Sequence, residues 1–209
     1  MENNTLICGS GLSSIKLYTI TRDRNVGGYE FLGTIPGTVG GACITNAGCY
    51  DGEIGNNILK VEVCDRKGNV RYLNRDECAF TYRNSIFTKN DIILSIYFRM
   101  DNYRDKEEIE KNFLTNKQKR EDTQPYYEKT CGSTFKNHKD KPAWKIIQEL
   151  GLQNVDFGGC KFSEKHANFL INYNDCTSKD IENLINYAKK KALEEKGINL
   201  ELEVKILGE

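Results

Sequence analysis

The pattern of hydrophobic and polar positions predicts helices and antiparallel strands. Apolar residues recur at helical spacing from residue 12 and stop at Gly27 and Gly28, a glycine pair that can end a helix. Residues 57–73 alternate in polarity on both sides of the sequence RKGN, which is typical of a β-hairpin. Residues 91–101 are almost continuously apolar and predict a buried strand.

The second half of the chain predicts three helices and a final strand. Residues 104–121 are acidic at the start and basic at the end, as the helix macrodipole favours, and Pro125 follows them. Residues 142–151 begin with proline and end with glycine, and residues 177–197 combine a Thr or Ser cap with a final glycine. Residues 198–208 alternate as a strand. Because strands and helices do not alternate strictly, we expect an α+β fold with long site-forming loops.

Composition narrows the class of partner. Thirty basic and thirty acidic side chains cancel among 209 residues, so we expect a small-molecule partner and no nucleic acid. The eight cysteines lie in hydrophobic segments without C-x-x-C spacing and are interpreted as buried free thiols in a reducing cytoplasm. No apolar run reaches the roughly 18 residues of a membrane span, and no signal-peptide pattern opens the chain. We therefore expect a cytoplasmic protein, a monomer, without a membrane partner or a metal.

The stretch GTIPGTVGGACITNAG, residues 33–48, is dense in glycine. Such a backbone could approach a planar or phosphorylated ligand closely, with N–H groups free to bind its oxygens, or it could form a tight turn. The density of glycine favours the ligand. The stretch is not a G-x-G-x-x-G fingerprint, and no Walker lysine follows it.

Two further segments carry candidate chemistry. In TYRNSIF, Arg83 could hold a carboxylate or phosphate, or it could only cap a surface strand. In CGSTFKN, Ser133 could donate a proton, while Lys136 and Asn137 could bind polar substrate groups. Most serines after glycine only form turns, so both interpretations stay open here.

Two acid–base residues are ambiguous when taken alone. His166, in GGCKFSEKHANFLIN, could contact a ligand or could be a structural histidine. Glu203, in the tail LELEVKILG, alone predicts a solvated edge strand. A serine nucleophile is not expected, because neither His138 nor His166 lies in a nucleophile-elbow motif.

Taken in order, these segments resemble the family of UDP-N-acetylenolpyruvoylglucosamine reductases, flavoenzymes of bacterial peptidoglycan synthesis. The matching phrases are GTIPGTVGGACITNAG, TYRNSIF, KREDTQP, CGSTFKN, GGCKFSEKHANFLIN and LELEVKILG. The short interval between TYRNSIF and KREDTQP resembles the subgroup without the tyrosine-loop insertion. The resemblance implies part of a PCMH/VAO-like FAD-binding domain over residues 1–104, followed by the family's α+β substrate-binding domain over residues 105–209.

The resemblance also implies an activity and the residues that carry it. The activity is the reduction of UDP-N-acetylglucosamine enolpyruvate to UDP-N-acetylmuramate with FAD and NADPH, a step of cell wall biogenesis that serves cell shape and division. By resemblance, Ser133 donates a proton, and Arg83 and Glu203 stabilise the enolate. Contacts with FAD are implied for Gly33, Ile35, Pro36, Gly37, Thr38, Gly40, Gly41, Asn46, Ala47 and Gly48. Contacts with the substrate are implied for Tyr82, Arg120, Lys136, Asn137 and His166.

One departure from the family leaves alternatives open. Members carry an N-terminal FAD-binding portion with its own glycine-rich motif, which we expect to be absent from this chain. A non-catalytic remnant that binds the UDP-sugar, or nothing, is therefore one alternative. A different FAD-dependent oxidoreductase on a related fold is another, although the pair CGSTFKN and LELEVKILG argues against it.

Overall fold

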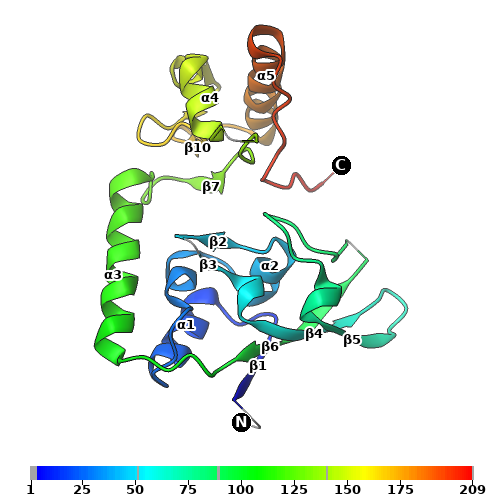
Figure 1. Ribbon diagram of the computed structural model, residues 1–209. Helices are drawn as coiled ribbons and strands as arrows, with labels where there is room; N and C mark the ends of the chain where they lie inside the picture. The colour runs from blue at the N-terminus through cyan, green and yellow to red at the C-terminus, as the bar shows by residue number, and fades with distance from the viewer. Residues whose placement is uncertain (1–3, 51, 89, 140, 209) are drawn as a thin grey trace. The chain divides into compact units, whose positions relative to one another are not determined.

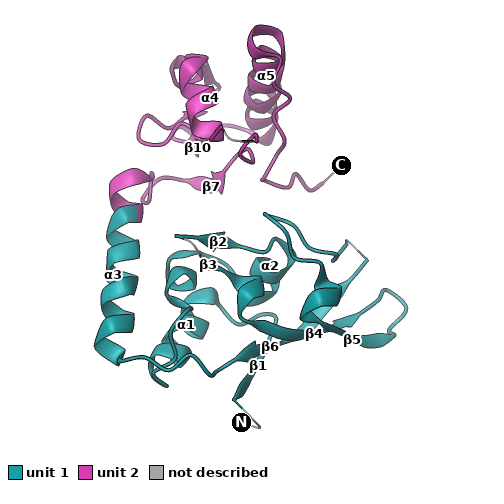
Figure 2. Cartoon of the chain, viewed as in Figure 1, with its two compact units in different colours: residues 1–119 teal, residues 120–209 magenta. Residues whose placement is uncertain are grey.

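The computed structural model describes residues 4–50, 52–88, 90–139 and 141–208 (Figure 1). The chain divides into two compact units, residues 1–119 and residues 120–209, which Figure 2 distinguishes by colour. Helix α3 (Lys106–Thr123) begins in unit 1, and its last residues belong to unit 2. Both units combine helices with antiparallel strands, so the α+β expectation is confirmed. A domain boundary at residues 104 and 105 stays a prediction.

Unit 1 is built on a four-stranded antiparallel sheet with the order β1-β6-β4-β5. Its strands are β1 (Thr5–Gly9), β4 (Ile58–Cys64), β5 (Val70–Asn74) and β6 (Ile92–Arg99), and a separate ribbon pairs β2 (Gly48–Cys49) with β3 (Gly52–Glu53). Its helices are α1 (Ser14–Arg22), α2 (Val39–Ile44) and the short 3-10 helices η1 (Glu30–Thr34), η2 (Ile54–Asn56) and η3 (Arg75–Cys78). Helix α2 packs on β6 and β1.

The sheet of unit 1 is buried on one face. Val61 and Phe98 are fully buried there, because alternate residues of a strand point to the same face. The predicted strand at residues 91–101 is confirmed as β6. The expectation that this strand is buried on both faces is wrong, since Ile92 and Leu94 are exposed while Ile93 is buried. One face of the sheet therefore packs against the core, and the opposite face exposes some apolar side chains to solvent.

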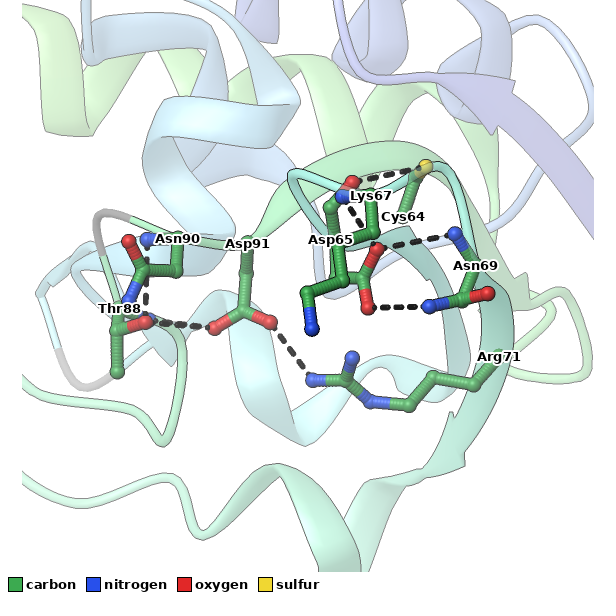
Figure 3. A network of polar contacts seen from close by, with 8 residues as sticks. All are labelled: Cys64, Asp65, Lys67, Asn69, Arg71, Thr88, Asn90 and Asp91. Atoms are coloured by element: carbon green, nitrogen blue, oxygen red, sulfur yellow. Dashed lines mark hydrogen bonds and ion pairs between the residues drawn. The ribbon is translucent and has the colours of Figure 1, made fainter.

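The predicted hairpin is confirmed as β4–β5, and polar contacts fix its turn (Figure 3). The Asp65 carboxylate accepts hydrogen bonds from the N–H groups of Lys67 and Asn69, at 2.8 and 3.0 Å. Next to the turn, the Arg71 guanidinium donates to the Asp91 carboxylate at 2.7 Å. This ion pair ties the edge strand β5 to the segment that leads into β6.

The predicted first helix is confirmed as α1, but it ends before the glycine pair. The Ser13 hydroxyl caps the helix by accepting from the Lys16 N–H at 3.3 Å. The last helical residue is Arg22, five residues before Gly27. Tyr18 is buried on this helix and stacks on Phe113 of α3, with ring centroids 4.4 Å apart.

Unit 2 is built on a second antiparallel sheet with the order β7-β10-β9-β8. The strands are β7 (Thr130–Ser133), β8 (Asp156–Phe157), β9 (Cys160–Phe162) and β10 (Phe169–Asn172). The helices are α4 (Ala143–Glu149), α5 (Ser178–Lys196) and the short η4 (Leu152–Asn154). Helix α5 packs on β8 and β9, and its apolar residues Leu184, Ala188 and Ala192, spaced four apart, are buried.

The ends of the unit 2 helices follow the sequence signals. Thr177 caps α5 through a capping box with Asp180, and Gly197 ends it in the left-handed conformation. The Glu149 carboxylate, at the end of α4, accepts hydrogen bonds from the ammonium groups of Lys141 and Lys196, at 2.6 and 2.8 Å. These two bonds lower the pKa of Glu149 to about 2. The helices expected over residues 142–151 and 177–197 are confirmed.

The final strand predicted over residues 198–208 is wrong. Within residues 198–208, all of which the structure describes, only Leu202 forms a β-bridge, opposite Phe135. Lys136 N–H donates to the Glu201 carbonyl at 2.8 Å, and Glu203 N–H donates to the Thr134 carbonyl at 2.9 Å. A strand requires a continuous partner, and the pairing partner here is a segment of only three residues.

The eight cysteines are all free thiols, as expected. Cys8, Cys43, Cys78 and Cys160 are buried, and burial raises the pKa of the Cys8 and Cys78 thiols to about 11. Cys131 is exposed, and Cys49, Cys64 and Cys176 are only partly buried, so the expectation of burial is wrong for these four. Within the residues that the structure describes, no helix combines the length and the apolar character needed to cross a bilayer.

Candidate functional site

The glycine-rich stretch of unit 1 is not an open loop, because residues Val39–Ile44 form helix α2. The Thr38 hydroxyl caps this helix by accepting from the Gly41 N–H at 3.3 Å. The Val39 N–H donates to the Leu12 carbonyl at 2.8 Å, and the Gly40 N–H donates to the Ser10 carbonyl at 2.9 Å. The amides of residues 39–41 are therefore engaged within the chain, contrary to the expectation of free N–H groups.

Three glycines of the stretch are required by packing against the protein itself. A Cβ atom at Gly33 would lie 2.7 Å from the Phe113 ring, and a Cβ atom at Gly40 would lie 2.8 Å from the Ser10 Cβ atom. A Cβ atom at Gly48 would overlap the main-chain carbonyl of Gly52 across the β2–β3 ribbon. The close approach that these glycines permit is thus between parts of this chain.

Two glycines of the stretch face open space. Among the described residues, apart from Gly37 and its two chain neighbours, none has an atom within 4 Å of the position of a Cβ at Gly37, whose φ is +112°. At Gly41 the nearest atom outside its chain neighbours and the backbone of its own helix is the Thr38 hydroxyl oxygen, at 3.7 Å. Pro36, Gly37, Thr38 and Gly41 are all exposed. The main chain that a flat ligand could approach is therefore concentrated at residues 36–38 and 41.

Asn46 joins the end of the stretch to two other segments. It is 1% exposed, and its amide nitrogen donates to the Glu53 carboxylate and to the Thr81 carbonyl, both at 3.0 Å. Its amide oxygen accepts from the Gly55 N–H at 3.1 Å. The side chain thus holds the segments around residues 55 and 81 against the stretch.

Arg83 is anchored at the same end of the glycine-rich stretch. Its guanidinium donates to the Gly48 carbonyl at 2.6 Å and lies 3.9 Å from the Glu53 carboxylate. Its main chain has a φ of +54°, a left-handed conformation that costs free energy outside glycine and often marks functional sites. The guanidinium also lies over the exposed Tyr82 ring, 4.9 Å from the centroid. Glu53, which contacts both Asn46 and Arg83, was missed in the sequence, where its signal is only that it is an acid five residues after the stretch.

In unit 2, a β-bulge determines which way Ser133 faces. Ser133 pairs with Phe169 and Thr130 pairs with Ile171, so two residues of β7 oppose one residue of β10. One of the two is Gly132, whose φ is +92°. Because successive residues of a strand point to opposite faces, the extra residue turns Ser133 to the other face of the sheet.

Glu203 lies beside the strand that carries Ser133. Its N–H donates to the carbonyl of Thr134, the residue after Ser133, at 2.9 Å, and its side chain is half-buried. Two candidate residues that lie far apart in the sequence therefore come from adjacent segments of unit 2. Arg83 belongs to unit 1.

Lys136 and Asn137 follow Ser133 and are held by neighbouring segments. The Lys136 ammonium pairs with the Glu201 carboxylate at 2.5 Å. The Asn137 amide oxygen accepts from the Ala143 N–H at 3.0 Å, at the start of α4. Their contacts with a substrate stay predictions.

His166 and Arg120 also have partners within unit 2. The His166 Nδ1 atom accepts from the Asn168 N–H at 3.3 Å, and the ring packs edge-on against Phe169. Burial lowers the pKa of His166, so the neutral imidazole is favoured. The Arg120 guanidinium donates to the Gln124 side chain at 2.7 Å. These contacts fit a structural histidine, and the substrate contacts predicted for both residues stay predictions.

Comparison with known proteins assigns both halves of the chain. Residues 1–74 match the FAD binding domain, and residues 124–207 match the C-terminal domain of UDP-N-acetylenolpyruvoylglucosamine reductase. UDP-N-acetylenolpyruvoylglucosamine reductase from Rickettsia conorii is 38% identical over 206 residues, which cover 99% of this chain and 70% of the relative. The reductase from Halalkalibacterium halodurans is 36% identical over 210 residues, which cover 100% of this chain and 69% of the relative.

The chain belongs to the UDP-N-acetylenolpyruvoylglucosamine reductase family. The fold agrees with this assignment, since the crystal structure of UDP-N-acetylenolpyruvylglucosamine reductase (MurB) from Thermus caldophilus matches with a TM-score of 0.85 at 29% identity. That match covers 98% of this chain and 73% of the other. The resemblance inferred from the sequence is therefore confirmed, together with an FAD-binding domain followed by the reductase family's C-terminal domain.

The residues of the FAD-binding domain fit a flavin in one respect. Gly37 and Gly41 are exposed and a Cβ would meet no close contact at either, so a planar ring has room to approach the main chain there. Contacts between FAD and residues 36–38 or Gly41 stay predictions. Contacts between FAD and the glycines at 33, 40 and 48 stay predictions, because packing within the chain already accounts for those residues.

Proposed function

We propose that this chain catalyses the reduction of UDP-N-acetylglucosamine enolpyruvate to UDP-N-acetylmuramate, with bound FAD and with NADPH as the electron donor. Membership of the family and the FAD-binding domain support a flavin-dependent oxidoreductase. The name of the relatives supports an enolpyruvyl UDP-sugar as the substrate. In the cell, this reaction would be a cytoplasmic step of peptidoglycan synthesis, performed by a monomer.

The proposed reaction requires the protein to stabilise a developing negative charge. Bound FAD would supply the redox chemistry, the overall transfer of hydride from NADPH to C3 of the enolpyruvyl group. Charge then develops at C2 and on the substrate carboxylate, where donors that are fixed in advance lower the barrier most. We assign this role to the Arg83 guanidinium and to Glu203, which can serve it by donating a hydrogen bond in its protonated form.

Ser133 would then donate the proton that C2 receives. A serine hydroxyl is a poor acid, so this step needs nearby positive charge or a proton relay to water. Lys136, three residues further along the chain, is a candidate for that charge within unit 2. The observation that carries the proposal is the hydrogen bond from Glu203 to Thr134, because it keeps an acidic residue beside the strand of the proton donor.

The test separates the two halves of the reaction. The protein loaded with FAD is expected to be yellow, to bleach with NADPH and to regain its colour when the enolpyruvyl UDP-sugar is added. Ser133→Ala should leave the bleaching intact and slow the recovery by about 10²-fold or more, since it removes only the proton donor. Ser178→Ala, at the exposed start of α5, is the matched control and should behave as the unmodified protein.

Other outcomes would assign a different function. Equal loss of both half-reactions in Ser133→Ala would remove Ser133 from the role of proton donor. Binding of the UDP-sugar by a protein that does not oxidise NADPH would support a non-catalytic binding role. Reoxidation by a different acceptor only would indicate another flavin-dependent oxidoreductase.

A further inference from the structure

Asn168 binds the main chain of Thr134 and Phe135, the two residues that follow Ser133. It lies immediately before β10 and is 4% exposed. Its amide nitrogen donates to the Phe135 carbonyl at 2.8 Å, and its amide oxygen accepts from the Phe135 N–H at 3.0 Å. Its main-chain carbonyl accepts from the Thr134 N–H at 2.7 Å.

The Asn168 side chain supplies the hydrogen bonds to Phe135 that a neighbouring strand would otherwise make. Regular pairing between β7 and β10 ends where Ser133 lies opposite Phe169. Phe135, two residues later, is fully buried, and a buried peptide group without hydrogen-bond partners destabilises the fold. An asparagine amide offers one donor and one acceptor side by side, as a peptide group does. Asn168 therefore satisfies Phe135 where the strand partner has ended.

The same short segment is held on its other edge by the tail. Glu203 binds the Thr134 carbonyl, and Lys136 binds the Glu201 carbonyl, through their N–H groups. Residues 134–136 are thus fixed between Asn168 on one side and residues 201–203 on the other. Ser133 directly precedes this segment, and Glu203 is bound to it.

We propose that Asn168 is a positioning residue for proton donation by Ser133. By fixing the main chain of residues 134–136, its amide sets the spacing between the Ser133 hydroxyl and the Glu203 carboxyl. This inference rests on the proposed function. We assign Asn168 no contact with the substrate, because the residue is buried and its amide already binds Phe135 on both sides.

Asn172 provides a matched control for the experiment. At the other end of β10, its amide nitrogen donates to the Cys176 carbonyl at 3.4 Å, and its amide oxygen accepts from the Cys176 N–H at 3.1 Å. Asn168→Ala and Asn172→Ala therefore remove the same kind of peptide clamp, one beside Ser133 and one away from it. Both variants should lower the thermal stability of unit 2.

The kinetic readout distinguishes positioning from a structural role. In the FAD-loaded protein, Asn168→Ala should lower kcat for reduction of the UDP-sugar by about 10²-fold, as expected for small misplacement of a reacting group. KM should change by less than about threefold, since no substrate contact is lost, and the rate of flavin reduction by NADPH should be unchanged. Asn172→Ala should leave all three quantities unchanged.

A conservative variant adds a pH profile. In Asn168→Asp, the introduced carboxyl keeps a donor and an acceptor while it is neutral, and loses the donor when it ionises against the Phe135 carbonyl. Burial raises the pKa of that carboxyl, so the ionised form should appear only as the pH rises through the raised value. Relative to the unmodified protein, kcat of Asn168→Asp should therefore be rescued at low pH and lost at high pH.

A second measurement is independent of turnover. Amide hydrogen exchange at Phe135 and Glu203 should accelerate in Asn168→Ala and not in Asn172→Ala, whether or not the protein reduces the sugar. If the unmodified protein lacks the reductase activity, the proposed function fails, and the exchange data still test the clamp. Equal losses of kcat in the two alanine variants, or unchanged exchange at Glu203 in Asn168→Ala, would overturn the positioning role.

Discussion

The glycine-rich stretch of unit 1 and the segment around Ser133 in unit 2 both depend on glycine, for different physical reasons. At Gly40 and Gly48, atoms of this chain occupy the space that a Cβ would need. At Gly132 the surrounding space is open, and the φ of +92° is what requires glycine. In unit 1 glycine permits two main chains to pack together, whereas in unit 2 it permits a bulge that turns a side chain. The difference shows that a glycine in a candidate site need not indicate contact with a ligand.

Gly48→Ala should have the largest effect. Its Cβ would overlap the Gly52 carbonyl, which is main chain in a two-stranded ribbon and has little room to move. We expect a loss of about 3 kcal/mol in the free energy of unfolding, as for severe overpacking. Denaturant unfolding followed by circular dichroism measures it. The single tryptophan, Trp144, lies in unit 2. The unfolding midpoint measured by its fluorescence should therefore change less than the midpoint measured by circular dichroism.

The control for this substitution is Gly11→Ala. Gly11 has open space around it and no positive φ, so an added methyl group should be tolerated. If Gly48→Ala and Gly11→Ala unfold at the same denaturant concentration, the packing explanation for unit 1 is wrong. Gly48→Asn should be no more stable than Gly48→Ala, because the loss comes from steric overlap at the Cβ position and not from the backbone angle.

Gly132→Ala should have an intermediate effect and a different remedy. An alanine in the left-handed region costs about 1–2 kcal/mol, and no steric clash adds to this at the open position. Gly132→Asn should recover part of the loss, since asparagine tolerates positive φ better than alanine does. Trp144 fluorescence in denaturant reports the stability of unit 2 for both variants. If Gly132→Ala and Gly132→Asn are equally stable, the backbone angle does not cause the loss of stability. Glycine would then not be required for different reasons in unit 1 and unit 2.

The regular elements could be predicted from the sequence because their signals are local. Helix α5 has an apolar stripe, the Thr177 cap and the final glycine at 197, all within its own sequence. The β4–β5 hairpin has alternation on both sides of a turn. Helix α2 was missed, because Gly40 and Gly41 disfavour a helix and the Thr38 cap with main-chain bonds to Ser10 and Leu12 stabilises it.

The rest of the candidate site depends on partners that are distant in the sequence. The tail alternates like a strand, but it meets only a three-residue partner, and the opposite edge of that partner is held by the side chain of Asn168. Ser133 and Glu203 were found by resemblance, and their adjacency comes from that tertiary contact. Asn168 was missed, although a polar residue within the apolar run of HANFLI is a signal for a buried, hydrogen-bonded side chain.

Gly41→Ala should have the smallest effect on stability. It is the sharpest test of whether a glycine of the stretch serves the fold or ligand binding. Gly41 lies in α2 with only an ordinary contact to Thr38, so alanine should stabilise unit 1 by about 0.5–1 kcal/mol through its higher helix propensity. Gly41 is exposed, as are residues 36–38, and we propose that the main chain there lies against the flavin.

For the same substitution, we therefore expect the affinity for FAD to fall by about tenfold, or about 1.4 kcal/mol, while the protein becomes no less stable. Quenching of flavin fluorescence measures the Kd. Gly40→Ala, one residue away, is the control, because its Cβ would meet Ser10 and it should lose stability before it loses any contact with the cofactor. Unchanged affinity in Gly41→Ala would mean that the open glycines of unit 1, like the packed ones, serve only the fold.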